Sequence, residues 1–165
     1  MSQTDRVMAD LVTEHITIAA PPDACFATAV DFDRYPEWAR DLKQVTVLTR
    51  DEQGRGRDVA FRAAGMGRSA NYTLRYDYRA APDRLAWVLI DGDLARKLDG
   101  YYDFAPSPDQ PDHTEVRYRL EVELILPLPG FVKRRTQSKI MHTALRELKS
   151  RVELEAGLVH RDPAD

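Results

Sequence analysis

A chain of 165 residues is about the size of one domain, long enough to bury a core without disulfide bonds or a structural metal. Its composition, 43% hydrophobic and 31% charged, excludes the collagen-like, disulfide-stapled and wholly disordered classes. The net charge of −3, from 24 basic and 27 acidic residues, lacks the basic excess of a nucleic-acid binder, so no nucleic-acid partner is predicted.

Targeting and metal-binding signals are missing from the sequence. No apolar run reaches the ~18 residues of a transmembrane helix, and the first residues lack the charged-then-apolar pattern of a secretion signal. A cytoplasmic protein is therefore expected. The single cysteine, Cys25, excludes an internal disulfide and a thiolate-rich zinc site, and the histidines form no His-x-x-x-His pair. No metal site and no cofactor are predicted.

The first elements predicted are a strand and two short helices. Residues 1–9 are expected to be a disordered segment, and residues 10–19 a strand, since β-branched residues alternate there with others. The pair of prolines that begins at Pro21 stops the strand and opens a helix over 24–30, because proline suits the first helical turn. A second short helix is expected over 35–39.

The middle of the chain has apolar residues at a period of two, which is typical of half-buried antiparallel strands. Turns rich in glycine, proline and aspartate divide it into six predicted strands: one from about residue 45 to the turn at 51–56, then 57–64, 69–79, 85–90, 98–104 and 115–126. The clearest alternation places one set of side chains on a single face: Ala70, Tyr72, Leu74, Tyr76 and Tyr78.

One long helix is predicted from about residue 130 to 156, followed by a tail at 157–165. Its apolar residues recur mostly at spacings of three and four, which marks the face turned to the core: Phe131, Ile140, Met141, Ala144, Leu145, Leu148 and Val152. Since no repeat or linker interrupts the pattern, residues 10–156 are expected to form a single domain.

These elements define a shape. Seven antiparallel strands with one apolar face need a cover, and only the last helix is long enough to supply it. A helix of about 25 residues spans ~38 Å, enough to cross a strongly curved sheet. The predicted fold is therefore α+β: a curved seven-stranded antiparallel sheet wrapped around a long C-terminal helix, with two short helices after the first strand. The wedge between sheet and helix predicts a cavity for an amphipathic small molecule.

Five stretches between residues 10 and 156 carry a resemblance to a known family: residues 18–21, residues 30–38, the hairpin of Trp87 and residues 91–94, residues 100–104, and the Leu128-Pro129-Gly130-Phe131 segment. They resemble the START-like helix-grip superfamily (SRPBCC), in particular its polyketide cyclase/dehydrase and coenzyme-Q-binding branch. The resemblance implies a helix-grip fold and a hydrophobic small-molecule ligand. Members carry lipids, bind quinones, cyclise polyketides or regulate chaperones, so the fold alone does not select a function.

The predicted wall of the wedge is rich in aromatic side chains, which suit a flat quinone or polyketide ring. An enclosed, mostly apolar pocket is predicted, with tyrosine hydroxyls as its main polar groups. The expected ligand-binding residues are Trp38, Phe61, Tyr72, Tyr76, Trp87, Tyr102, Phe104 and Tyr118 on the sheet side, and Met141 and Leu145 on the helix. Both tryptophans can equally be plain core residues.

No recognisable catalytic constellation is present, so the sequence leaves open whether the protein is an enzyme. Glu14 interrupts an apolar strand face, and is either an edge residue near the start of the strand or a carboxylate in the cavity with a general-acid role. Tyr72, Tyr76 and Tyr102 are the other catalytic candidates. The first hypothesis is binding or transport of a lipid, quinone or polyketide-like molecule, the second a polyketide aromatase/cyclase, and the third a ligand-free interaction protein.

The start of the last helix is basic. Lys133, Arg134 and Arg135 lie in its first turns, where positive charge opposes the helix dipole. These residues either pair with the outward glutamates of the sheet or make transient contact with an anionic headgroup or membrane surface. The sequence does not indicate an oligomeric state.

Overall fold

The computed structural model describes residues 10–65, 67–125 and 128–157, so the predicted segment 1–9 and nearly all of the predicted tail lie outside the described residues. The elements follow the predicted order of one strand, two short helices, six strands and a long helix. They are β1 (Asp10–Ile18), α1 (Pro22–Ala29), the 3-10 helix η2 (Phe32–Glu37), β2 (Leu42–Arg50), β3 (Gly56–Gly65), β4 (Arg68–Asp77), β5 (Arg84–Gly92), β6 (Ala95–Pro106), β7 (Thr114–Leu124) and α2 (Gly130–Glu155).

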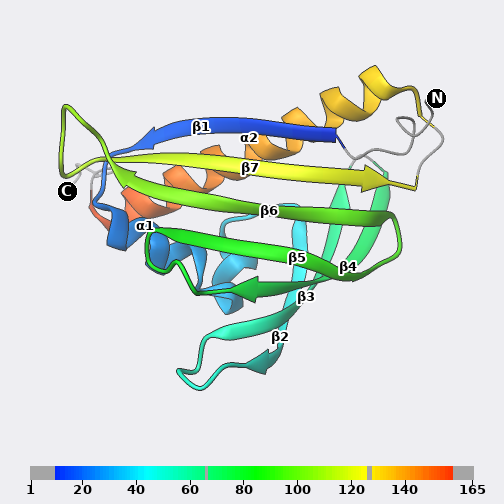
Figure 1. Ribbon diagram of the computed structural model, residues 1–165, viewed down its shortest axis with the longest axis horizontal. Helices are drawn as coiled ribbons and strands as arrows, with labels where there is room; N and C mark the ends of the chain where they lie inside the picture. The colour runs from blue at the N-terminus through cyan, green and yellow to red at the C-terminus, as the bar shows by residue number, and fades with distance from the viewer. Residues whose placement is uncertain (1–9, 66, 126–127, 158–165) are drawn as a thin grey trace, which may run out of the picture.

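The sheet has seven antiparallel strands in the order β1-β7-β6-β5-β4-β3-β2. Consecutive strands from β2 to β7 pair as neighbours, and the last strand, β7, also pairs with the first strand, β1. Figure 1 shows the sheet curving, with β2, β3 and β4 turned steeply across the direction of β5, β6, β7 and β1, while α2 lies behind β1 and β7. The predicted α+β helix-grip fold is therefore confirmed.

Period-two alternation fixes which side chains face the helix. On β7, Val116, Tyr118 and Leu120 are buried, whereas Arg117 and Arg119 between them are exposed. The other strands continue the same two faces, because paired residues in an antiparallel sheet point to the same side. We call the covered side the inner face and the solvated side the outer face.

The second short element is a 3-10 helix that begins earlier than the predicted 35–39. Proline at position 36 removes a backbone donor, which favours a short, tight helix. Phe32 and Tyr35 are buried, and the Tyr35 hydroxyl donates a hydrogen bond to the Ala29 carbonyl oxygen. A Cβ on Gly56 would lie 2.8 Å from the Phe32 ring, so this glycine gives the ring its place against the sheet.

The predicted inner stripe of α2 is right over most of the helix and wrong at its start. The buried residues are Gln137, Met141, Leu145, Leu148 and Val152. Phe131 and Ile140, which were expected to face inward, are 59% and 54% exposed. The first turns of α2 stand away from the strands (Figure 1), and Gln137 continues the stripe there by donating from Nε2 to the Leu120 carbonyl oxygen at 3.0 Å.

Polar contacts fasten the other end of α2 to the start of the domain. The Glu153 carboxylate accepts hydrogen bonds from the Ala19 backbone N–H at 2.8 Å and from Lys149 Nζ at 2.6 Å. Lys149 also donates to the Thr17 carbonyl oxygen at 2.9 Å. Thr28 of α1 donates to Glu155 at 3.2 Å. These hydrogen bonds join the last turns of α2 to the end of β1 and to α1. They fix the position of the C-terminal end of the helix against those two elements.

Glu153 should make stability depend on pH. Burial pushes the pKa of this carboxyl upward, but the hydrogen bonds from Lys149 and Ala19 outweigh it and leave the pKa below its ordinary value of 4.5. Its stabilisation is therefore fully present above that ordinary value and is lost as pH falls through the lowered pKa. We expect Glu153→Gln to lower the free energy of unfolding by about 1–2 kcal/mol at pH 7, and the difference to shrink as the pH falls through the lowered pKa of Glu153.

Urea unfolding of both proteins at several pH values measures this difference. Glu52→Gln, at an exposed turn position, serves as the control and should change little at any pH. A Glu153→Gln deficit that keeps its full size at acidic pH would contradict the assignment.

Candidate functional site

Aromatic rings from neighbouring strands meet on the inner face. Three of the predicted site residues lie directly against one another: the ring centroids of Trp87 and Tyr102 are 5.2 Å apart, those of Trp87 and Tyr118 5.9 Å, and those of Tyr102 and Tyr118 4.6 Å. Tyr76 and Phe104 extend this group at 5.9 Å from Trp87 and 6.0 Å from Tyr102. We call these five residues the ring cluster.

Strand register explains these contacts. Tyr76 is the cross-strand partner of Trp87, and Tyr102 is the cross-strand partner of Tyr118. Directly opposed residues on one face have Cβ atoms about 5 Å apart, close enough for rings to touch. Phe61 and Tyr72 form a further cross-strand pair, stacked with centroids 5.2 Å apart.

Two aromatic residues that the sequence analysis did not assign to the site connect these groups. Phe32 lies 4.6 Å from the Tyr76 ring, and Tyr35 lies 6.2 Å from the Phe61 ring. Both come from η2. Their spacing of three residues, which places two side chains on one side of a 3-10 helix, was the signal that could have predicted their burial.

The inner face is covered unevenly from one end to the other. At the end near α1, Ile18, Leu85, Phe104 and Val116 are at most 2% exposed. At the opposite end, beside the start of α2, apolar inner-face side chains are only half-buried, and β1 and β3 to β7 contribute seven of them: Val12, Ala63, Ala70, Tyr72, Leu89, Leu98 and Leu124. We call these seven residues the open end, because the helix stands off there and leaves them partly accessible.

The tyrosines of the ring cluster, and Tyr72 at the open end, are neutral phenols. Burial raises the pKa of Tyr72, Tyr76, Tyr102 and Tyr118, and neighbouring tyrosines add to this rise at Tyr76, Tyr102 and Tyr118. Such phenols can donate hydrogen bonds to a carbonyl oxygen, but they cannot serve as bases at neutral pH.

The indole N–H of Trp87 is a buried hydrogen-bond donor without an acceptor in the described part of the chain. The side chain of this residue is 5% exposed. A buried donor without a partner costs about 1–3 kcal/mol. Sequence reasoning could place this tryptophan on the inner face but could not predict that its nitrogen would lack an acceptor.

Glu14 lies on the inner face of β1. It is half-buried and is the cross-strand partner of Tyr118, whereas His15 beside it is exposed on the outer face. The residue therefore sits in the middle of the strand and not at its start. Within the described part of the chain its carboxylate makes no hydrogen bond or ion pair. Its carboxylate therefore shares the inner face of the sheet with the ring cluster.

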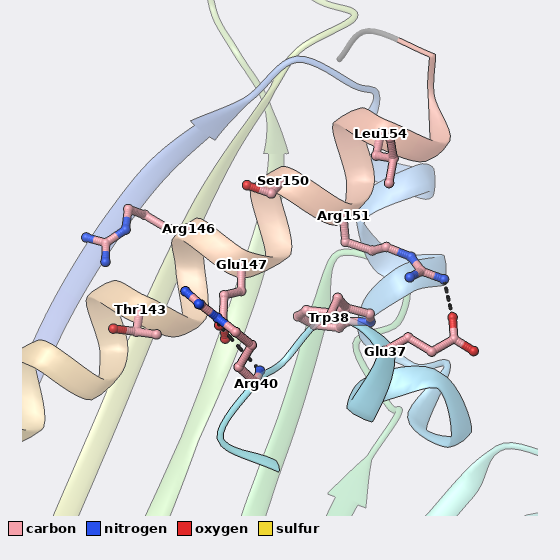
Figure 2. A pocket seen from close by; sticks show the side chains of 9 residues that line it. All are labelled: Glu37, Trp38, Arg40, Thr143, Arg146, Glu147, Ser150, Arg151 and Leu154. Atoms are coloured by element: carbon pink, nitrogen blue, oxygen red, sulfur yellow. Dashed lines mark hydrogen bonds and ion pairs between the residues drawn. The ribbon is translucent and has the colours of Figure 1, made fainter. Parts of the chain in front are cut away.

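Trp38 lies apart from the ring cluster. It lines a surface hollow of about 430 Å³ between η2 and α2, and its ring packs on Tyr35 at 4.9 Å. Figure 2 shows its indole between two ion pairs that span the hollow, Arg40 with Glu147 at 3.6 Å and Arg151 with Glu37 at 2.7 Å. The charged groups of this hollow are largely paired with one another, which indicates a structural junction between η2 and α2.

Two further hollows are described. One of about 420 Å³ is formed at the ends of β3 and β4 and includes Tyr76, with arginines that are mostly paired to aspartates. The other, of about 280 Å³, lies between α1, η2 and the end of α2. None of the three hollows is lined by Tyr72, Tyr102 or Tyr118. The enclosed pocket expected between sheet and helix, with Met141 and Leu145 facing it, therefore stays a prediction.

The described residues form neither a metal-binding site nor a reactive cysteine site. They contain no cluster of three or more histidine, cysteine, aspartate or glutamate side chains able to hold a metal ion. Burial raises the pKa of the Cys25 thiol, which keeps it protonated and unreactive. Among the described helices, none is both long enough and apolar enough to cross a membrane.

Solved structures with this architecture are known. The chain is similar to a START superfamily protein from Mycobacterium smegmatis, with a TM-score of 0.81 and 25% identity over 87% of this chain and 97% of that one. It shares its fold with a protein from Thermus thermophilus at a TM-score of 0.74 and 21% identity, covering 88% of this chain and 99% of that one.

A third similar fold is the Zhui aromatase/cyclase from Streptomyces sp. R1128, with a TM-score of 0.74 and 14% identity over 88% of this chain and 94% of that one. No curated protein matches the sequence. The family model described as polyketide cyclase / dehydrase and lipid transport matches residues 10–153, which include every strand and nearly all of α2. The chain therefore belongs to this polyketide cyclase/dehydrase and lipid transport family of the START-like superfamily.

Proposed function

We propose that the protein binds and carries a hydrophobic small molecule between the inner face of the sheet and α2, with entry at the open end. The observation that carries this proposal is the change in burial along the inner face, from Ile18 and Val116 at 0% exposure to a row of half-buried apolar side chains at the other end. Apolar surface left accessible beside a packed core is what a hydrophobic ligand covers. The family description, which joins lipid transport with polyketide chemistry, supports a ligand of this class.

The side chains on the inner face of the sheet indicate the kind of ligand. On the described strands β1 and β3 to β7, Glu14 is the charged residue at an inner-face position beside the ring cluster, and Asp10 and Arg68 stand at inner-face positions only at strand ends. No cation of these positions therefore lies next to the rings to hold an anionic group. The ring cluster offers flat apolar surfaces, and the tyrosine hydroxyls and the Trp87 N–H offer hydrogen-bond donors. A neutral ring system with carbonyl oxygens, such as a quinone or a polyketide-like molecule, matches this set.

Tryptophan fluorescence tests the proposal. The chain has two tryptophans, Trp38 and Trp87, so Trp38→Phe leaves a single reporter inside the ring cluster. We expect 1,4-naphthoquinone to quench this reporter saturably, with one binding site per chain. In the matched variant Trp87→Phe the remaining tryptophan lies in the surface hollow, and its quenching should stay linear with quinone concentration. Native mass spectrometry of the purified protein should also show a co-purified apolar molecule.

Absence of both saturable quenching and a co-purified molecule would overturn the proposal. The ligand-free interaction protein would then be the leading interpretation, because the fold would remain without a ligand to explain the open end.

A second candidate function, polyketide aromatase/cyclase, rests on Glu14. Its carboxylate faces the inner side beside Tyr118 without an ion-pair partner in the described residues, so it can take a proton from the carbon next to a ketone. Phenol donors such as Tyr102 or Tyr72 would stabilise the resulting enolate oxygen. Tyr76 is more deeply packed against Phe32 and is the weaker of the three tyrosine candidates.

If this activity exists, Glu14→Gln should lower kcat about 100-fold while KM changes little, because general acid–base catalysis typically contributes ~10²–10⁴-fold. The assay follows ring formation from a short poly-β-ketone thioester by absorbance. His15→Gln on the outer face is the control and should keep full activity. Cyclisation no faster with the wild-type protein than in buffer would leave the carrier function alone.

A further inference from the structure

One exposed side of α2 carries a basic stripe with an aromatic residue at its start. Phe131, Arg135, Lys139, His142 and Arg146 follow one another at spacings of four, four, three and four, so they lie along the same side of the helix. All five side chains are exposed, and Phe131 is 59% exposed. We call these five residues the α2 stripe.

The stripe differs from the three basic residues on which the sequence analysis relied. Lys133 is half-buried and lies two positions before Arg135, which turns it toward the opposite side of the helix. Arg134 takes part in an interaction of its own. Of those three residues, only Arg135 belongs to the stripe.

The positive charges of the stripe are not neutralised by the rest of the described chain. No acidic residue occurs between Gly130 and Arg146, and Arg135, Lys139 and Arg146 form no ion pair among the described residues. The outward glutamates of the sheet pair elsewhere, Glu121 with Lys97 at 3.4 Å and Glu123 with Arg96 at 3.7 Å. Of the three basic residues for which the sequence analysis considered pairing with the sheet, Arg135 forms no such pair among the described residues.

In the second half of α2, in contrast to the stripe, basic side chains form ion pairs with acidic residues of the same helix. Lys149 pairs with Glu153 at 2.6 Å, and Arg151 pairs with Glu155 at 2.8 Å. Those cations stabilise the helix and its junction with β1. The cations of the stripe have no such partner on the helix, since no acidic residue lies three or four positions from Arg135, Lys139 or Arg146.

Apolar side chains are exposed next to the stripe. Ile125 is 45% exposed and Leu128 36% exposed, just before Phe131 in the passage from β7 to α2. Leu124, a residue of the open end, immediately precedes Ile125. Exposed apolar groups flanked by unpaired cations are typical of surfaces that sit at the boundary of headgroups and acyl chains.

We propose that the α2 stripe, with Leu128 and Ile125, docks the protein on a bilayer containing anionic phospholipid, with the open end turned toward the lipid. Charge complementarity selects the occupant: the cations meet the headgroups, and Phe131 and Leu128 enter the boundary with the acyl chains. The chain as a whole is acidic, with a net charge of −3, so the attraction is local to this side. Docking in this orientation would let an apolar ligand pass between the bilayer and the inner face without crossing water.

Vesicle flotation tests the proposal with the whole chain. We expect the protein to float with vesicles of phosphatidylcholine and phosphatidylglycerol in a 70:30 mixture, to bind pure phosphatidylcholine at least about tenfold more weakly, and to dissociate in high salt. Arg135→Gln/Lys139→Gln should weaken binding to the anionic vesicles about 30-fold, from about 1 kcal/mol for each basic residue near the surface. Phe131→Ser should weaken it about tenfold.

Matched controls separate the stripe from net charge and from general hydrophobicity. Arg117→Gln/Arg119→Gln makes the same charge change on the outer face of β7, and Leu48→Ser removes a 55% exposed apolar group from β2. Both controls should bind anionic vesicles like the wild type. Equal binding to the two vesicle types, equal loss in the controls, or tighter binding to a 30-nucleotide DNA than to vesicles at equal phosphate concentration would overturn the proposal.

The experiments that test bilayer docking and ligand binding are independent of each other. Vesicle flotation does not depend on a bound ligand, and quenching of Trp87 by naphthoquinone does not depend on a membrane. A protein that binds the quinone but not anionic vesicles would overturn the docking surface and leave the proposed function in place.

Discussion

Replacing Gly100 by alanine should lower the free energy of unfolding by about 3 kcal/mol, at the upper end of what overpacking costs. Gly100 lies in β6 between Trp87 of β5 and Leu120 of β7. A Cβ at this position would overlap the carbonyl oxygen of Arg119. A backbone atom cannot swing aside as a long side chain can, so β7 would have to move, and Tyr118 would move with it.

Urea unfolding followed by tryptophan fluorescence measures the loss. Gly65→Ala is the matched control, because a Cβ there would lie 3.4 Å from the Asp41 carboxyl carbon, an ordinary contact with a side chain that can adjust. We expect the control to change stability by less than about 1 kcal/mol. Equal effects of the two substitutions would show that the close approach at Gly100 does not constrain the sheet.

Ala70→Phe should lower the affinity for 1,4-naphthoquinone on the order of 10- to 100-fold, the equivalent of losing burial of one large apolar group. Ala70 and its cross-strand partner Ala63 are both half-buried on the inner face at the open end. Two small side chains opposite each other leave space that a phenyl ring would occupy. The substitution adds no tryptophan, so quenching in the Trp38→Phe background still reports on binding.

Ala105→Phe, at an exposed position on the outer face of β6, is the control for this substitution. Both variants should keep the far-ultraviolet circular dichroism of the parent protein. Unchanged affinity in Ala70→Phe would mean that the ligand does not pass or occupy the open end.

Much of the inner wall could be predicted because a strand has only two faces. Alternation over residues 69–79 and 115–126 placed Tyr72, Tyr76 and Tyr118 on the side away from the arginines, and the structure keeps them there. The contacts between them required the strand register. Register depends on turn lengths and on irregularities such as the shift between Thr73 and Leu74 in the pairing of β4 with β5, which the alternation does not reveal.

The start of α2 and the end of η2 are the two places where the sequence pattern did not predict how side chains are arranged. Helical spacing showed which side of α2 faces the core, but it could not show that the sheet curves away from the first turns of the helix. Phe131 was therefore expected to be buried, and Gln137, which is polar, was not considered for the buried stripe. Trp38 was expected beside the cavity, and the structure places it in the hollow between η2 and α2 with Arg151 and Glu37.

The pairing of β1 with β7 has a consequence for synthesis on the ribosome. Ile18 is opposite Thr114, and Asp10 is opposite Val122, so the first strand to be made has no strand partner until the last strand emerges. Translation at about 5–20 residues per second makes this delay on the order of 5–20 s. The helix that covers β1 is made later still. During that time Ile16 and Ile18 are apolar groups on an unpaired strand, so this nascent segment is where the chain most needs protection from misassembly.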